Sequence, residues 1–397
     1  MFILVQLCQF RLDRCLGMLM KVRYLCLITL LVFSCRSYEQ AIYEFDPRDN
    51  IRQKFTLAEI VDSISYIPLD NRIPIGMYYQ YTVVNNLLYL SVKDIGILVF
   101  NSNGRILGKI GNTGRGPGEY LFFMSFAVDE ENGNIYVMDY NIIKTYSGSG
   151  KYIRSIPLWE TGGYFQEVNY FKSKLFIPEY ILTGKATYNW IIMDTLGSIL
   201  SRKRNYTPEF SSTFLFKGGT YKFDNTISYW NLYNDTVFTI CPDLTYKASF
   251  LFSKGDHRHP RYRIEDYSTL ADVFHPHLVF ETDCYYILSF YYKKSTIVFI
   301  DKKNGNTFVS YPDQGTGGIV NDIDGGMGFS PTGYFSDKHR EYITNLISAH
   351  SLKTFIQTPE FRKSIPKYPE KKKELDKLAD SLKETANPIL MIVRLKK

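Results

Sequence analysis

Short apolar runs separated by turn residues recur along the chain. Each run ends on an apolar residue followed by a polar turn, at Phe100, Tyr146, Met193, Ile240 and Ile300. The steps between these positions are 46, 47, 47 and 60 residues. Units of four short strands with a period in the forties are typical of β-propeller blades. The pattern therefore predicts a propeller. A β-sandwich is the alternative if the spacing is coincidental.

A glycine follows four of the five apolar positions within five residues. These glycines are Gly104, Gly150, Gly197 and Gly305, and Leu244 takes the equivalent place in the fourth copy. Hairpin turns often need a positive φ, which glycine adopts without steric cost. We therefore expect a tight turn at the same point of every unit.

Five units follow from this alignment, at roughly 77–110, 123–157, 164–203, 216–252 and 277–311. A sixth blade is predicted from residues 319–336, the C-terminal strand and the N-terminal ISYIPLD, so that both chain ends share it. Such sharing closes the ring and removes its free edges. The expected fold is an all-β, six-bladed β-propeller over residues 63–397.

Residues 338–385 interrupt the β pattern. Leu375, Leu378 and Leu382 recur at helical spacing, which predicts a helical insert. The insert falls between the second and third strands of the last blade. We expect it to lie on the same face as the loop 110–120 and to cover part of the channel mouth.

The N-terminal stretch has the features of a secretion signal. Lys21 and Arg23 precede an apolar run that is too short for a permanent membrane span. The run ends in Val-Phe-Ser-Cys35, a lipobox-like motif with a rather large phenylalanine. We expect an upstream extension and lipoprotein signal peptide over residues 1–34, lipidation of Cys35, and a lipid-anchored spacer over 35–62. A buried N-terminal helix is the alternative.

Composition and charge narrow the functional classes. The 397 residues are 45% hydrophobic and 16% aromatic, which suits a β-rich globular protein. Removing residues 1–34 takes away four basic and one acidic residue, so the net charge falls from +7 to +4. This charge is too small and dispersed for a nucleic-acid partner. Of six cysteines, Cys241 and Cys284 lie beyond the lipobox; free thiols are expected, and a bridge between them stays open.

The chain resembles the six-bladed β-propeller lipoproteins of Bacteroidetes, which are loosely related to NHL-type propellers. The likeness rests on the lipobox at Cys35 and on IGNTGRGPGEY (110–120), FAVDEENGNIYVMD (126–139), NDTVFTI (234–240), NDIDGG (321–326) and NPILMIVRLKK (387–397). The resemblance implies the propeller fold and a lipid-anchored location in the bacterial cell envelope, at the outer membrane and on either its periplasmic or its outer side. It implies no catalytic residues.

Four charged residues are candidates for ligand binding. Arg115 and Glu119 lie in a loop between two blades, and Asp94 and Asp139 in loops between the second and third strands of a blade. Both kinds of loop are expected on one face, at the mouth of the central channel. Arg115 offers a two-pronged contact for a carboxylate. The alternative is that Arg115 and Glu119 pair and fix their own loop.

Two groups of residues are candidates for metal binding. Asp322 and Asp324 supply oxygen ligands that suit calcium, although an Asn-, Asp- and Gly-rich turn explains them without a metal. Two His-x-His pairs share a strand face if they lie on strands; they are His257 with His259 and His275 with His277. A charged loop and Pro276 favour solvated histidines instead. No cofactor is predicted, and calcium is the alternative.

Two functions remain. The preferred one is a non-enzymatic envelope protein that binds a glycan, peptide or protein partner at the channel mouth, because tyrosine-rich blades suit sugar stacking. The alternative is a propeller enzyme, a metal-assisted lyase or hydrolase acting on a carbohydrate or lactone. The membrane is expected to be contacted through the N-terminal lipid. The ligand and the oligomeric state stay open.

Overall fold

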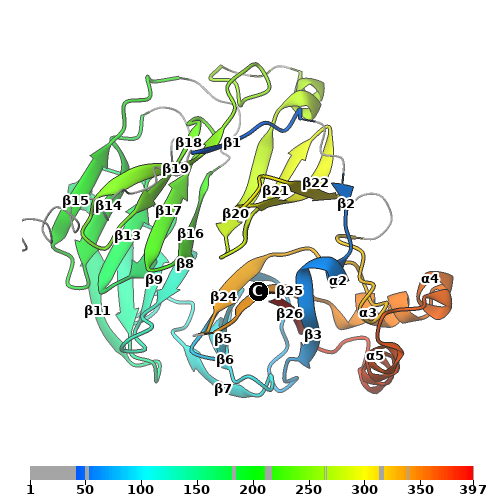
Figure 1. Cartoon of the computed structure of the whole chain (residues 1–397). Coiled ribbons are helices and arrows are strands. Elements are labelled where there is room, and N and C mark those ends of the chain that lie inside the picture. The colour runs from blue at the N-terminus through cyan, green and yellow to red at the C-terminus, as the bar shows by residue number, and fades with distance from the viewer. Residues whose placement is uncertain are drawn as a thin grey trace, which may run out of the picture. The chain divides into compact units, whose positions relative to one another are not determined.

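Six β-sheets form the blades of a propeller in the computed structural model of the protein (Figure 1). The structure describes residues 42–49, 53–180, 185–210, 217–262, 264, 266–312, 317–337 and 339–396. Residues from Glu44 onward form one compact unit. The predicted six-bladed, all-β fold is confirmed.

Blades 1 to 3 each have four antiparallel strands in chain order from the inside outward. Blade 1 contains β4 (Tyr78–Val84), β5 (Leu87–Val92), β6 (Gly96–Phe100) and β7 (Ile106–Ile110). Blade 2 contains β8 (Phe123–Val128), β9 (Ile135–Asp139), β10 (Ile142–Tyr146) and β11 (Tyr152–Pro157). Blade 3 contains β12 (Asn169–Phe171), β13 (Lys174–Pro178), β14 (Tyr188–Asp194) and β15 (Ile199–Arg204), after the short 3-10 helix η1 (Trp159–Thr161).

The sheets of blades 4, 5 and 6 each contain one strand from the N-terminal part of the chain. Blade 4 contains β16 (Gly219–Phe223), β17 (Thr226–Trp230), β18 (Thr236–Ile240) and β19 (Tyr246–Phe252), with β1 (Tyr43–Phe45) outside them. Blade 5 contains β20 (His275–Glu281), β21 (Tyr285–Tyr292), β22 (Lys294–Asp301) and β23 (Thr307–Ser310), preceded by η2 (Tyr267–Asp272) and flanked by β2 (Gln53–Lys54). Blade 6 contains β24 (Gly333–Ser336), β25 (Glu341–Ile347), β26 (Ile389–Leu395) and β3 (Val61–Pro68).

Blade 6 closes the ring from both chain ends. β26 pairs with β3 along its whole length, and the inner strand β24 contacts β4 of blade 1. The buried Asn387 side chain fixes the exit from this blade. Its amide donates to the carbonyls of Asp70 and Ile73 at 2.7 and 2.8 Å, and its oxygen accepts the Ile75 amide at 2.7 Å. The predicted sharing of one blade between the termini is confirmed.

The turn after the third strand adopts a positive φ in all five units predicted from the sequence. The φ values are 75°, 86°, 104° and 73° at the four glycines, and Leu244 adopts 73° in the fourth copy. The turns at Gly104, Gly150 and Gly197 also pack closely on the preceding blade. A Cβ added to Gly104 would lie 2.1 Å from the Pro68 carbonyl oxygen, and one at Gly150 would lie 2.7 Å from that of Lys109. Both the backbone conformation and the close approach therefore require glycine here.

An N-terminal strap, which we define as residues 42–49 and 53–60, lies along the outer strands of blades 4 and 5. It contains β1, β2 and the helix α2 (Leu57–Ile60), in which Leu57 and Ile60 are buried. Asp322 holds the start of α2, because its carboxylate accepts the Thr56 hydroxyl at 2.7 Å and the Ala58 amide at 2.8 Å. The predicted propeller boundary at residue 63 is therefore too late. Part of the predicted spacer belongs to the folded unit.

The helical insert lies between β25 and β26, as predicted, but it is shorter than residues 338–385. Residues 341–347 form β25 instead of helix because their apolar and β-branched side chains pack into blade 6. The insert contains α3 (Ala349–Ile356), α4 (Pro359–Lys363) and α5 (Pro369–Ser381). These helices bury Leu352, Phe361 and Leu375 beside Tyr66 of the outer strand β3. They lie at the outer margin of the ring (Figure 1), so the expectation that they cover the channel mouth is wrong.

Candidate binding face

The loop face is the side of the ring that carries the connections between blades and the turns between second and third strands. An ion pair anchors this face at blade 2. Asp139, at the end of β9, lies 3.1 Å from the Lys144 ammonium, and both side chains are nearly buried. The other Asp139 oxygen accepts the amides of Leu121 and Phe122 at 3.2 and 2.8 Å. Asp139 therefore fixes the backbone of the connection between blades 1 and 2.

Beside this anchor, three aromatic side chains form what we call the aromatic row, made of Phe122, Tyr140 and Tyr164. The ring centroids are 6.4 Å apart between Phe122 and Tyr140 and 5.9 Å apart between Tyr140 and Tyr164. The three residues are 63%, 49% and 42% exposed. They come from three different turns and connections of the loop face. A continuous row of solvent-exposed rings is thus available to a ligand.

Tyr140 occupies a backbone conformation that favours glycine. It is the first residue of the two-residue turn between β9 and β10, and its φ is +54°. A left-handed conformation costs a residue with a Cβ roughly 1–2 kcal/mol. The Tyr140 ring is half exposed and contacts the rings of Phe122 and Tyr164. Strained residues of this kind cluster at functional sites.

The glycine-rich loop 110–120 is fixed against blade 2. The Lys144 ammonium donates to the Glu119 carbonyl, and the Tyr146 hydroxyl donates to the Gly118 carbonyl at 3.1 Å. The Glu119 carboxylate accepts the Gly116 amide at 2.9 Å. Within the described chain, Arg115 and Glu119 do not form the ion pair that was the alternative. Arg115 is exposed, and its contact with a ligand stays a prediction.

The remaining predicted carboxylates lie apart from one another. Asp94 is exposed at the turn between β5 and β6, with a φ of 61°. Asp322 binds the strap, whereas Asp324 is buried and accepts the Asn321 side-chain amide at 2.7 Å and the Gly326 amide at 2.8 Å. Burial raises the pKa of Asp324. Asp322 and Asp324 thus hold different parts of the fold, and the described residues contain no group of three His, Cys, Asp or Glu arranged to hold a metal ion.

The four predicted histidines lie close to the junction of blades 4 and 5, but they are not all solvated. His257 and His259 are 3% and 7% exposed, so the interpretation of a solvated pair is wrong for them. The Nε2 atom of His259 lies 2.7 Å from Nδ1 of His275, and the rings of His275 and His277 are 4.7 Å apart. Of the two neutral rings of His259 and His275, one donates a hydrogen bond to the other. His257 and His259 are thus buried, whereas His275 is partly buried and His277 is exposed.

Burial, together with the charge of a neighbouring imidazole, lowers the pKa of His259 to about 3 and that of His275 to about 4. The unfolded chain therefore binds protons first as the pH falls below about 6.5. Stability should be complete above that value and decline towards pH 4, by about 1.4 kcal/mol per pH unit for each group. Urea unfolding at pH 7, 6 and 5 checks this slope. His275→Gln should make the stability depend less steeply on pH. The control His350→Gln, at an exposed position of α3, should leave the slope unchanged. Equal slopes in the wild type and both variants would contradict the role of His275.

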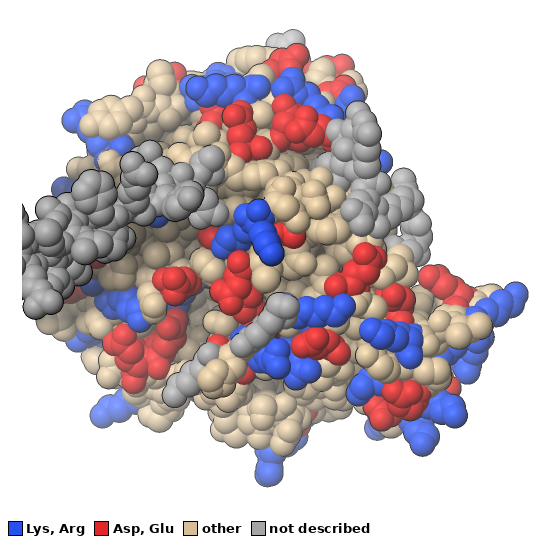
Figure 2. Space-filling model, in the orientation of Figure 1, with Lys and Arg blue, Asp and Glu red and all other residues tan. Residues whose placement is uncertain are grey.

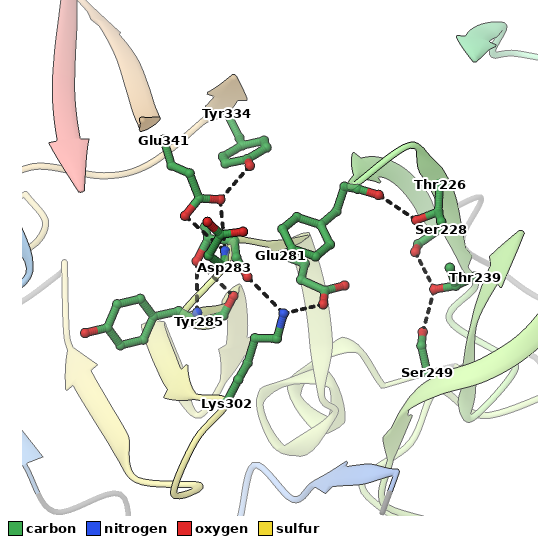
Figure 3. Close-up of polar contacts among 12 residues, drawn as sticks. Thr226, Ser228, Thr239, Ser249, Glu281, Asp283, Tyr285, Lys302, Tyr334 and Glu341 are labelled. Carbon is green, nitrogen blue, oxygen red and sulfur yellow. Dashed lines mark hydrogen bonds and ion pairs between the residues drawn. The ribbon is translucent and has the colours of Figure 1, made fainter. Parts of the chain in front are cut away.

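A polar network joins blades 5 and 6 on the side opposite the loop face (Figure 3). Lys302 lies 2.7 Å from a Glu281 oxygen, and its ammonium lies over the rings of Phe223 and Tyr286. Glu341 accepts the Tyr334 hydroxyl at 2.7 Å and the Asp283 amide at 2.9 Å. Burial raises the pKa of both glutamates. These contacts are made between protein groups, so the network serves to join blades.

Sequence reasoning missed Phe122, Tyr140, Tyr164 and Lys144. Their positions are far apart in the chain, and only the blade topology brings them together. One indication was available, since the apolar Leu-Phe-Phe run directly follows a loop in which apolar side chains are not needed.

Charge does not define a binding surface on the face seen in Figure 2. Basic and acidic side chains are interspersed there, and neither sign forms a continuous field. Among the described residues, no helix is long and apolar enough to cross a membrane.

The chain belongs to the family described as domain of unknown function DUF4934, whose model matches residues 42–394. No match was found among curated proteins. The propeller is similar to that of a candidate exported protein of Bacteroides fragilis, with 19% identity, 90% of this chain and 100% of that chain covered, and a TM-score of 0.66. This likeness concerns the fold.

Two further solved structures are more distant. A DUF4221 member from Bacteroides vulgatus has 11% identity, covers 85% of this chain and 97% of its own, and gives a TM-score of 0.45. A streptogramin B lyase has 13% identity, 70% and 80% coverage, and a TM-score of 0.43. Neither similarity supports an inference about activity.

Proposed function

We propose that this DUF4934 protein is a cell-envelope binding propeller that holds a carbohydrate on the aromatic row of its loop face. The observation that carries the proposal is Tyr140. Its exposed ring lies in the middle of the row, on a left-handed backbone of a kind that clusters at functional sites.

The chemistry of the row suits sugars better than the other ligands considered. A sugar presents an apolar C–H face to an aromatic ring and hydroxyl groups at its rim. Phe122 offers a purely apolar ring, whereas Tyr140 and Tyr164 add phenol groups that can hydrogen-bond at the edge. A ligand that spans all three rings would be an oligosaccharide rather than a monosaccharide.

The enzyme alternative receives less support. It requires a metal-ligating group, and in the described residues His259 and His275 hydrogen-bond to each other instead. Elemental analysis of the purified protein separates the two functions. A stoichiometric metal would favour the enzyme.

A glycan array followed by titration of the strongest binder tests the proposal. We expect Phe122→Ala, Tyr140→Ala and Tyr164→Ala each to weaken binding about fivefold, because contact with one aromatic ring contributes on the order of 1 kcal/mol. Tyr206→Ala is the matched control, since Tyr206 is 77% exposed and lies outside the row. Absence of glycan binding, or equal loss in the control, would contradict the proposal. If a peptide instead of a glycan binds on the aromatic row, the ligand class is peptide and not carbohydrate.

We propose further that Cys35, which lies outside the described residues, carries the lipid that anchors the protein. Radiolabelled palmitate should label the wild-type protein in a bacterial host and fail to label Cys35→Ser. The variant should also move from the membrane fraction to the soluble fraction. Retention of the variant in the membrane fraction would contradict a lipid anchor.

A further inference from the structure

The outer strands of blades 1, 2 and 3 share an irregularity at the same place. In β7, Ile106 and Gly108 pair with consecutive residues of β6, so Leu107 is the extra residue of a β-bulge. Ile153 is the extra residue in β11, and Leu200 is the extra residue in β15. Each lies three positions after the turn glycine of its unit. Bulges re-aim side chains and are features that a fold retains for a purpose.

The three bulge residues are aliphatic and exposed. Leu107, Ile153 and Leu200 are 58%, 45% and 44% exposed. A bulge that only protects a sheet edge would be served better by a charged side chain. Blade 5 has no bulge at this place, but the strap packs on its outer strand, since the Phe55 and Phe308 ring centroids are 5.9 Å apart. The outer strand of blade 5 therefore has an apolar partner, whereas the three bulge residues are exposed.

Basic residues surround the bulges. The stretches 105–110, 151–157 and 198–204 contain seven lysines and arginines and no acidic residue. Among the ion pairs of the described residues, none involves any of these seven: Arg105, Lys109, Lys151, Arg154, Arg202, Lys203 and Arg204. Two copies of this surface would repel each other. The complementary partner is acidic.

The strap shows how a chain can bind at this position. β1 adds a fifth strand to β19, although β19 itself carries a bulge at Ser249, and β2 adds one to β23. No described strand pairs in this way with β7, β11 or β15, which are the last strands of four-stranded sheets. They lie at the outer margin of three successive blades (Figure 1). An exposed edge strand presents N–H and C=O groups with which an extended polypeptide can pair.

We propose that the outer margin of blades 1 to 3 is a docking surface for an extended, acidic segment of a partner protein, which pairs with β7, β11 or β15 and packs an apolar side chain on the bulge residue of that strand. Strand addition supplies main-chain hydrogen bonds, and side-chain contacts supply specificity. This surface is separate from the aromatic row and does not depend on carbohydrate binding.

Fluorescence anisotropy with a labelled eight-residue peptide of alternating glutamate and valine tests the proposal. The wild-type protein should bind it, and the peptide with lysine in place of glutamate should bind at least tenfold more weakly. A variant with Leu107→Ser, Ile153→Ser and Leu200→Ser should lose at least tenfold in affinity at unchanged thermal stability. Ile365→Ser is the control, since Ile365 is 93% exposed on the distant insert.

Three results would overturn the proposal. The first is the absence of peptide binding at millimolar concentration. The second is unchanged peptide affinity in the serine variant, which would mean that only unspecific attraction between charges holds the peptide. The third is binding of phosphatidylglycerol vesicles, abolished by the same substitutions, without binding of the peptide. If the triple variant loses stability, the double variant Arg202→Gln with Arg204→Gln takes its place in the test. This double variant should bind the peptide more weakly, and its affinity should depend less on salt concentration.

Discussion

Replacing Lys144 with methionine is expected to destabilise the propeller by about 3–5 kcal/mol, the usual cost of removing one partner of a buried ion pair. Methionine fills a similar volume but leaves the Asp139 carboxylate with only the two backbone amides of the connection. It also removes the donor to the Glu119 carbonyl. Urea unfolding at pH 7 measures the change.

The double variant Lys144→Met with Asp139→Asn separates charge from packing. It removes the unpaired charge, so it should be more stable than the single variant. Lys222→Met is the control for an exposed pair, since Lys222 binds Glu130 at the surface, and such pairs contribute about 0–1 kcal/mol. A loss below about 1 kcal/mol in Lys144→Met would mean that the anchor is not important for stability.

Gly104→Ala is expected to cost more than about 2 kcal/mol, because a left-handed backbone alone costs a residue with a Cβ about 1–2 kcal/mol. The new methyl group would also lie 2.1 Å from the Pro68 carbonyl oxygen, at the contact between blades 1 and 6. The turn must therefore shift at the point where the ring closes. Thermal unfolding should show a clear fall in the midpoint temperature.

Leu244→Gly is the reciprocal control. Leu244 has the same φ as the turn glycines but carries a side chain that is only partly buried against its neighbours. Glycine should relieve the strained backbone and raise stability by up to about 1 kcal/mol, less the lost contacts. If Gly104→Ala were neutral and Leu244→Gly destabilising, the turn position would not require a positive φ.

The repeat made the fold predictable from the sequence. One apolar residue followed by a turn, at three steps near 47 and one of 60, located the third strand of five units. A glycine occupies the turn in four of them, and Leu244 adopts the same positive φ in the fourth unit. The sharing of blade 6 between the two ends of the chain was predictable because the ring has to close. These features depend on local chemistry repeated along the chain, which a sequence displays directly.

The errors have equally local causes. Residues 341–347 were assigned to a helix because they adjoin a helical pattern, although blade 6 selects them as a strand. His257 and His259 seemed solvated because charged residues flank them, whereas tertiary packing buries both. The aromatic row combines residues 122, 140 and 164, and no sequence period links them. A site whose residues come from separate blades therefore cannot be predicted from the sequence alone.

The most direct test of carbohydrate binding on the loop face is Tyr140→Gly, measured both by urea unfolding and by titration with the strongest ligand from the glycan array. The account predicts that stability rises by about 1 kcal/mol, because glycine accepts the +54° φ. It also predicts that affinity falls about fivefold, because the central ring of the row is lost. A variant with unchanged affinity would contradict the proposed site, and one with lower stability would show that Tyr140 is retained for folding.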